Sequence, residues 1–321
     1  MTLPEFDFGE GFNGGQLTRL REAAHWFGSF RIRHPLLPAV RCGEAVELAR
    51  AFFKLPKEEK QRLAIDGSPH FRGFSVMENE RDWREQLHLG REEVSRGGPP
   101  YEQLRGPNLW PQDNGWKQRM LELISDLESA AEDVLRTLAL SLDMPDSRFL
   151  HESETSYLVF KLIHYQPLSG TEPRLGVAPH VDFSWITLLL QDDTGGLEFS
   201  TAEGSWLKVP GVPGTLVINL GEIMEFATRG YYRATPHRVV NSVRSRISMP
   251  FFLNPALDSR IDPIDSFMSG EPPHRMAEGE PGTSTHVHRV FSEVRRDPVV
   301  YGDEEWKRKG LGIYCQACFA R

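Results

Sequence analysis

Apolar residues recur every three to four positions through much of the first half of the chain. This spacing is typical of amphipathic helices and predicts helices at residues 16–30, 44–53, 56–63 and 115–142. Residues 66–112 are rich in glycine, proline and charge, so we predict a long covering loop there. The N-terminal half is therefore expected to be mainly helical.

From about Tyr157 the pattern changes to short apolar runs separated by turn residues. These runs are SYLVFKLIHY, SWITLLLQ, GLEFST, WLKVP, GTLVINLG, HRVVNS and SRISMPFFLN. Many short strands without long helices between them favour an antiparallel sandwich or barrel. A short helix is expected at EIMEFATRG, and two more at residues 285–295 and 302–310, after a surface loop at residues 270–284.

The composition is that of a soluble globular protein, with 39% hydrophobic and 26% charged residues. A net charge of -8 gives no electrostatic footprint for nucleic acid or for an anionic membrane. No apolar window approaches the roughly 18 residues of a membrane span, and the acidic N-terminus does not resemble a secretory signal. The oligomeric state is not predicted by the sequence.

The three cysteines, Cys42, Cys315 and Cys318, are too few for a disulfide framework and favour a reducing, cytoplasmic location. Cys315 and Cys318 form a C-x-x-C near the C-terminus, which alone would suggest half of a zinc site or a redox pair. No second cysteine or histidine pair with suitable spacing accompanies them. We interpret them as two thiols in a tail.

The strongest chemical signal is the segment Pro179-His180-Val181-Asp182 at the start of a predicted strand. Alternate residues of a strand point to one face, so His180 and Asp182 are expected to project into one cavity. They would form two thirds of a two-histidine, one-carboxylate iron site, for which His237 is the candidate third ligand. The alternative for the pair alone is a hydrogen-bonding role at a strand end.

Arg246 and Ser248 follow His237 and share a strand face by the same spacing. A guanidinium and a hydroxyl together make a receptor for a carboxylate, which suits a dicarboxylic cosubstrate reaching from the metal. An ordinary surface salt bridge is the alternative for Arg246. That alternative does not account for the Arg-x-Ser spacing after His237, the candidate third ligand.

With these residues in place, the chain resembles the iron(II)- and 2-oxoglutarate-dependent dioxygenases of the isopenicillin N synthase-like family. The resemblance covers nearly the whole chain. It rests on the segments DWREQLHLGRE, GPNLWP, APHVDFSWITLLLQDDTGGLEF, GTLVINLGEIMEFATRGYYRATPHRVV and SRISMPFFLNP.

The resemblance implies a mainly β fold: a distorted double-stranded β-helix, or jelly roll, with N-terminal helices and a C-terminal helical segment. It implies Fe(II) bound by His180, Asp182 and His237, and 2-oxoglutarate held by Arg246, Ser248 and Tyr165. Many family members carry asparagine where this chain has Ile163, so the orientation of 2-oxoglutarate is open at that point.

The implied activity is oxidation of a small organic molecule with O2, by hydroxylation, desaturation or ring closure, with release of succinate and CO2. Ascorbate is an expected reductant. Three alternatives stay open: an iron oxidase without 2-oxoglutarate, a non-catalytic receptor on the same barrel, and a metal-binding cupin. The last would not need the Arg246 and Ser248 anchor.

Candidate substrate-binding residues come from several parts of the chain. They are Lys161, Phe183, Trp185 and Phe252 near the proposed metal site, and Arg72, Phe74, Arg81 and Arg84 in the N-terminal covering segment. Core packing is the alternative for each aromatic residue, and solvation for each arginine. Two converging arginines would indicate an anionic substrate. We expect an N-terminal region (1–150), a jelly-roll core (151–258) and a C-terminal segment (259–321) within one compact unit.

Overall fold

The structure is a computed structural model that describes residues 2–79, 81–150, 156–170, 174–264 and 298–310. Four sequence predictions lie outside this part of the chain. They are the loop at residues 270–284, the helix at residues 285–295, and the two thiols of Cys315 and Cys318.

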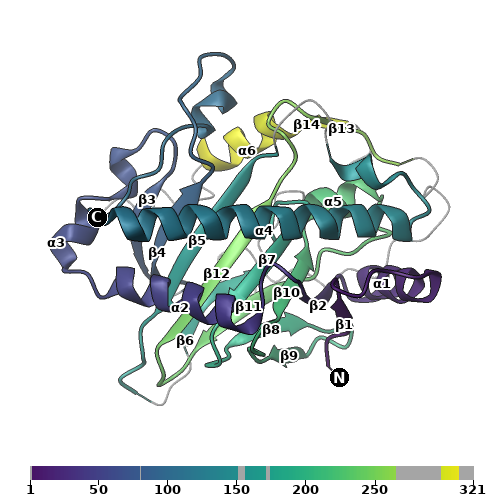
Figure 1. Cartoon of the computed structure of the whole chain (residues 1–321), viewed down its shortest axis with the longest axis horizontal. Helices are drawn as coiled ribbons and strands as arrows, with labels where there is room; N and C mark the ends of the chain where they lie inside the picture. The colour runs from purple at the N-terminus through teal and green to yellow at the C-terminus, as the bar shows by residue number, and fades with distance from the viewer. Residues whose placement is uncertain (1, 80, 151–155, 171–173, 265–297, 311–321) are drawn as a thin grey trace.

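Two antiparallel β-sheets form the centre of the molecule (Figure 1). The larger sheet has, in spatial order, β1 (Glu5–Asp7), β2 (Ser29–Arg33), β10 (Leu216–Leu220), β7 (Ile186–Gln191), β12 (Arg246–Leu253), β5 (Leu158–Tyr165), β4 (Trp83–Gly90) and β3 (Gly73–Glu78). The smaller has β6 (Arg174–His180), β11 (His237–Asn241), β8 (Leu197–Ser200) and β9 (Trp206–Val209). Among the strands that the structure describes, β1 and β2, at one edge of the larger sheet, are the pair that runs parallel. A separate ribbon pairs β13 (Arg260–Ile261) with β14 (Val299–Val300).

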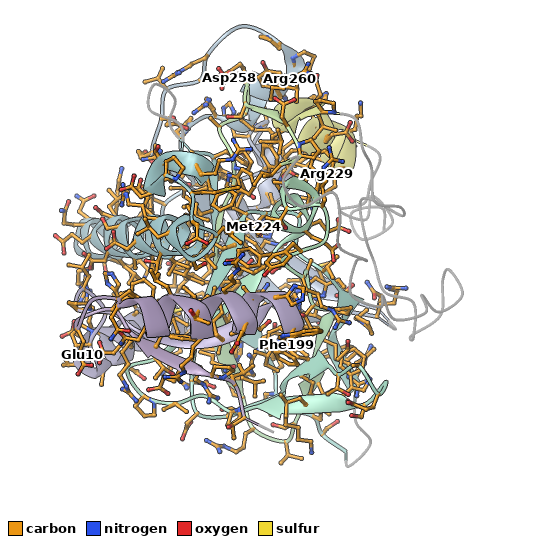
Figure 2. The ribbon with its side chains drawn as sticks, turned by 90° about the vertical axis from the view of Figure 1, so that its right-hand side faces the viewer. Glu10, Phe199, Met224, Arg229, Asp258 and Arg260 are labelled. Atoms are coloured by element: carbon orange, nitrogen blue, oxygen red, sulfur yellow. The ribbon has the colours of Figure 1, made fainter. Side chains whose placement is uncertain are left out.

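The two sheets face each other across an apolar layer. Ile163 and Leu189 of the larger sheet pack in one buried cluster with Phe199 and Val239 of the smaller sheet. Figure 2 labels Phe199, which belongs to this cluster, and Met224, which belongs to the larger apolar cluster of the protein; both are fully buried. The expected jelly roll is therefore confirmed.

Helices cover the other face of the larger sheet, where α4 runs across the strands with α2 beside it (Figure 1). The helices are α1 (Gly14–Trp26), α2 (Ala39–Phe53), α3 (Lys57–Gln61), α4 (Asn114–Ser141), α5 (Glu222–Ala227) and α6 (Tyr301–Gly310), with short 3-10 turns at Ile65–Gly67, Pro100–Leu104 and Asp146–Phe149. Asp113 caps α4 by accepting a hydrogen bond from the Trp116 amide. The apolar stripe of α4, which includes Met120, Leu127 and Val134, is buried as the helical spacing predicts.

The predicted loop at residues 66–112 is wrong, because β3 and β4 form the edge of the larger sheet within it. On β4, Leu87 and Leu89 point toward the helices, whereas Gln86 and His88 point toward the space between the sheets. The inward face of this strand is polar. On the helix-covered face, the charged Glu85 interrupts the apolar positions, so the apolar-polar alternation that marks most half-buried strands is weak in the sequence.

Two boundaries also differ from the predictions. The helix expected at residues 16–30 ends at Trp26, because Gly28 turns the chain with φ +69° and β2 begins directly after it. The strand at His180 ends there rather than starting there, so Asp182 lies in the following turn. Strands β1 to β4 join the same sheet as the core strands, and the region boundaries at residues 150 and 258 stay a prediction.

Candidate active site

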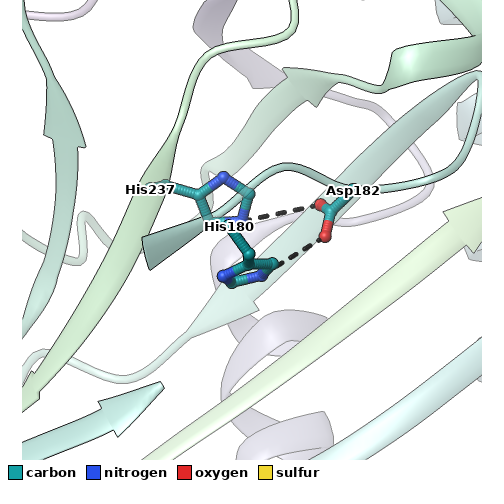
Figure 3. Close-up of side chains that lie close together, drawn as sticks. All are labelled: His180, Asp182 and His237. Carbon is teal, nitrogen blue, oxygen red and sulfur yellow. Dashed lines mark ion pairs between the residues drawn. The ribbon is translucent and has the colours of Figure 1, made fainter. Parts of the chain in front are cut away.

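His180, Asp182 and His237 converge where β6 ends and β11 begins (Figure 3). His180 ends β6 and His237 begins β11, and the two are direct cross-strand partners. Their ring centroids lie 4.2 Å apart. Asp182 follows His180 by two residues, and its carboxylate oxygens lie 3.5 Å from Nε2 of His180 and 3.7 Å from Nε2 of His237. One potential ligand atom from each residue lies within 4.8 Å of the others.

Backbone carbonyls orient both imidazoles. Nδ1 of His180 donates to the Ala178 carbonyl at 2.9 Å, and Nδ1 of His237 donates to the Thr235 carbonyl at 3.2 Å. A proton on Nδ1 leaves the lone pair on Nε2, which is the atom that faces Asp182. Both rings are thereby set in the tautomer that can bind a metal through Nε2.

Two polar side chains of the larger sheet hold the Asp182 carboxylate. Thr187 Oγ1 and Asn219 Nδ2 donate to Asp182 Oδ2 at 2.7 Å and 2.6 Å. The sequence reasoning missed both donors, although Asn219 stands out as a polar residue within the apolar strand LVINL. These bonds fix the carboxylate, with Oδ1 facing His180 and Oδ2 facing His237.

The protonation of the cluster suits metal binding. Burial alone would raise the pKa of Asp182, but the two imidazoles and the Thr187 hydroxyl bring it well below its usual value. Burial, assisted by the neighbouring His180, lowers the pKa of His237 to about 4. At neutral pH the site therefore offers a carboxylate and a neutral His237 imidazole, the donors that a non-haem ferrous ion requires.

Arg246, Ser248 and Tyr165 lie together on the inner face of the larger sheet. Arg246 pairs with Tyr165 across β12 and β5, and its guanidinium carbon lies 4.8 Å from the tyrosine ring centroid. Ser248 Oγ is 3.5 Å from the Tyr165 hydroxyl. Gln191, which the sequence reasoning also missed, accepts a hydrogen bond from Arg246 Nη2 at 2.8 Å.

The Arg246 guanidinium is buried and only partly satisfied. The residue is 2% exposed, and its Nε and Nη1 have no hydrogen-bond partner among the described residues. Buried N–H groups are rarely left unpaired. Guanidinium N–H groups lie in one plane, which is the geometry that grips both oxygens of a carboxylate. The donor set therefore fits the distal carboxylate of 2-oxoglutarate, while Ile163, directly across from Ser248, contributes only apolar surface.

Four of the candidate substrate residues lie on or beside the inner face. Lys161 shares the face of Tyr165 on β5, and its Nζ lies 5.1 Å from the Phe252 ring centroid. Phe252 is half-buried and pairs with Thr187, which holds Asp182. Arg72 is buried, just ahead of β3. Arg84 is ion-paired with Asp82 and donates to the Gly176 carbonyl at 2.7 Å.

The remaining candidates lie in packed surroundings. Phe183 stacks on Tyr301 at 5.6 Å. Phe74 packs against Phe52 at 6.2 Å, on the helix side of the larger sheet. Trp185 contacts Phe149 at 5.3 Å. Arg81 belongs to the turn between β3 and β4, where its amide donates to the Asn79 side chain.

Two family models match this chain. The 2OG-Fe(II) oxygenase superfamily matches residues 156–255, and the N-terminal region of the non-haem dioxygenases, described from morphine synthesis, matches residues 3–113. A 2-oxoglutarate-Fe(II) type oxidoreductase of Aspergillus fumigatus is 33% identical over 301 residues, which cover 88% of this chain and 87% of that protein. The chain belongs to the 2OG-Fe(II) oxygenase superfamily.

Solved structures agree with this assignment. A full-length Neurospora crassa protein in complex with alpha-KG superposes with a TM-score of 0.78 at 21% identity, covering 96% of each chain, and supports the fold. A structure assigned to the 2OG-Fe(II) oxygenase family from Caulobacter crescentus gives a TM-score of 0.75 at 26% identity, covering 96% of this chain and 99% of that one. The expected family and fold are therefore confirmed.

Family membership identifies the class of enzyme. The protein is an Fe(II)- and 2-oxoglutarate-dependent oxygenase that acts on a small molecule. The receptor and cupin alternatives are not supported by any of these similarities. Among the described residues, no helix combines the length and the apolar character needed to cross a membrane.

Proposed function

We propose that His180, Asp182 and His237 bind the ferrous ion of this oxygenase, and that Arg246, Ser248 and Tyr165 hold the distal carboxylate of 2-oxoglutarate. One observation carries the proposal: each metal-facing side chain is oriented by a second hydrogen bond, from Nδ1 of each histidine or to Oδ2 of Asp182. Surface clusters of histidine and aspartate do not need such support.

The bound ferrous ion and 2-oxoglutarate would supply O2 activation, with 2-oxoglutarate leaving as succinate and CO2 while the small molecule is oxidised. The residues of the chain position these partners. Asp182 and the two histidines would supply three ligands to the ion, a number that leaves coordination positions for other ligands. Arg246 and Ser248 fix the far end of 2-oxoglutarate, so its oxo acid end reaches the metal in one orientation. The apolar layer around Leu189 and Phe199 keeps bulk water away.

The test is the iron content and 2-oxoglutarate turnover of His180→Ala and Asp182→Ala. Both variants should lose stoichiometric iron, measured by mass spectrometry after anaerobic loading, and should release no succinate above background. Asp193→Ala is the matched control, because Asp193 is 74% exposed and pairs only with Arg244 at the surface. Normal iron content in both site variants would refute the ligand assignment.

We further propose that the enzyme is cytoplasmic and has no nucleic-acid partner. The net charge of -8 and the small number of cysteines support this. Fractionation of cells that express the tagged protein would test the location. Retention on immobilised DNA or RNA at physiological salt would contradict the second part.

A further inference from the structure

Arg72 carries a buried charge that the proposed chemistry does not use. The residue is 1% exposed, and within the described ranges its side chain makes one hydrogen bond, from Nη2 to the Leu104 carbonyl at 3.4 Å. Nε and Nη1 have no partner among the described residues, and Arg72 forms no ion pair with them. Its guanidinium carbon lies 5.7 Å from the Tyr157 ring centroid, which supplies no hydrogen-bond acceptor for the open N–H groups. A buried charge without an anionic partner is costly, so an arginine in this state calls for one.

The guanidinium of Arg72 lies against Gly90 at the end of β4. A Cβ atom at position 90 would lie 2.1 Å from Arg72 Nη2 and 2.3 Å from its guanidinium carbon. Gly90 and His88 are two residues apart on β4, so a side chain at position 90 would point to the same sheet face as His88. This is the inner face that also carries Arg246 and Ser248.

Strand register connects this position to the proposed metal centre. Gly90 pairs with Val159, Val159 with Phe252, and Phe252 with Thr187, which forms one row across β4, β5, β12 and β7. Thr187 donates its hydroxyl proton to Asp182. Three strand spacings of about 4.8 Å place Gly90 about 14 Å from Thr187 along the sheet. Phe252, which is half-buried, lies between the two ends.

The neighbouring row adds the positive charge of Lys161. His88 and Lys161 are direct cross-strand partners on this face. Burial lowers the pKa of His88 well below its usual value, and Lys161, Lys309 and Arg72 lower it further. Lys309 lies 3.5 Å from a Glu305 carboxylate oxygen, whereas Arg72 has no such pairing within the described ranges.

We propose that Arg72 binds a carboxylate of the substrate, and that Phe252 packs against the substrate between this carboxylate and the carbon that is oxidised. The inference rests on the proposed function, because it takes the metal centre as one end of the substrate site. It assigns this enzyme a small carboxylic acid as substrate. The inner face then holds two separate carboxylate receptors: Arg246 for the cosubstrate and Arg72 for the substrate.

The experiment compares acids with their uncharged amides. Protein loaded anaerobically with Fe(II) and saturating 2-oxoglutarate is titrated by calorimetry with phenylacetate, indole-3-acetate and 4-phenylbutyrate, and with the three corresponding primary amides. Saturating 2-oxoglutarate occupies the Arg246 receptor, so that the titration reports on the second receptor. Wild-type protein should bind at least one acid 10- to 100-fold more tightly than its amide, roughly the usual range for hydrogen bonds to a charged group. No preference for any acid would overturn the proposal.

Two variants assign the preference to Arg72. Arg72→Gln should bring acid and amide affinities within about threefold of each other, because the charge-assisted bonds are lost. Gly90→Ala should do the same by displacing the guanidinium while keeping its charge, and therefore also covers the case in which Arg72→Gln does not fold. Arg33→Gln, which removes an exposed arginine paired with Glu5, should keep the full preference. An acid preference that survives in Gly90→Ala and in folded Arg72→Gln would contradict the assignment.

The same samples separate this inference from the proposed function. If wild-type protein binds neither iron nor 2-oxoglutarate, the proposed function fails. If it binds both and still shows no acid preference, only the substrate inference fails.

Discussion

The two faces of the β4–β5 strand pair bury charged side chains in opposite ways. On the helix-covered face, Glu85 accepts hydrogen bonds from Lys60 Nζ at 2.6 Å and from His164 Nδ1 at 2.7 Å. His164 Nε2 in turn lies 2.9 Å from the Ser245 hydroxyl. On the inner face of the same sheet, Arg246 of the adjoining strand β12 has buried N–H groups without a partner among the described residues, as does Arg72 beside the β4–β5 pair.

The difference separates structural charge from receptor charge. A buried carboxylate with two cationic or imidazole partners is satisfied within the fold, and removing it leaves those partners unpaired. A buried guanidinium with open donors adds little to the fold and gains its partner when a ligand arrives. Burial alone does not distinguish a structural charge from a receptor charge. The presence or absence of hydrogen-bond partners for the buried group does.

The largest expected effect comes from breaking the satisfied face. Glu85→Leu leaves Lys60 and His164 buried without their carboxylate, so the free energy of unfolding should fall by about 3–5 kcal/mol. Urea denaturation measures it. The control Glu5→Gln breaks an ion pair in which the Glu5 side chain is 39% exposed, and should cost less than about 1 kcal/mol. Equal losses of unfolding free energy in Glu85→Leu and Glu5→Gln would show that the buried Glu85 contributes no more to stability than an exposed ion pair.

Arg246→Met should weaken 2-oxoglutarate binding and leave the free energy of unfolding nearly unchanged, which is the opposite of the stability loss expected for Glu85→Leu. The 2-oxoglutarate affinity, measured by anaerobic calorimetry, should fall by about 2–3 kcal/mol, or roughly 30- to 150-fold, because the charge-assisted bonds to the carboxylate are lost. The free energy of unfolding without ligand should change by less than about 1 kcal/mol, since the open donors are removed together with the charge. A large stability loss with unchanged 2-oxoglutarate affinity would reverse the interpretation of this arginine.

A smaller effect is expected at the metal centre. Asn219→Ala removes one of the two donors that orient Asp182, and should weaken iron binding by about 10- to 100-fold, as support residues of metal ligands usually do. Competition with a ferrous chelator measures the change. Asn254→Ala is a matched control, because Asn254 is equally buried and donates only to the backbone carbonyls of Tyr157 and Phe252. Similar iron affinities in the two variants would argue against a supporting role for Asn219.

The smallest expected effect is a pH dependence of stability. Burial alone would raise the pKa of Glu85, but hydrogen bonds from His164 and Lys60 lower it below its usual value. Its contribution to stability is therefore complete above the unfolded-state pKa of about 4.3 and is lost as the pH falls through the folded-state pKa. Below a pH of about 4.3 the urea midpoint of wild-type protein should fall more steeply than that of Glu85→Gln. Parallel profiles would show that Glu85 does not titrate differently in the two states.

Residue spacing alone predicted which residues of the candidate site lie close together in several cases. Alternation along a strand correctly placed Arg246 and Ser248 on one face, because β12 is regular from Arg246 onward. The same rule predicted that His180 and Asp182 lie close together, and they do. Strand alternation is not the reason, because Asp182 lies beyond the end of β6. Strand β4 could not be anticipated in this way, because the charged Glu85 interrupts the apolar positions on its helix-covered face.

Local period and residue type were enough to predict the main helices, the core strands, the order of the two histidines and the aspartate, and the Arg-x-Ser pair. Which buried charges find partners follows from the folded arrangement of the chain. Glu85 meets Lys60 from α3, whereas Arg72 meets the space left by Gly90. These contacts join residues far apart along the chain, so they depend on strand register and helix packing, which the local pattern of side chains does not specify.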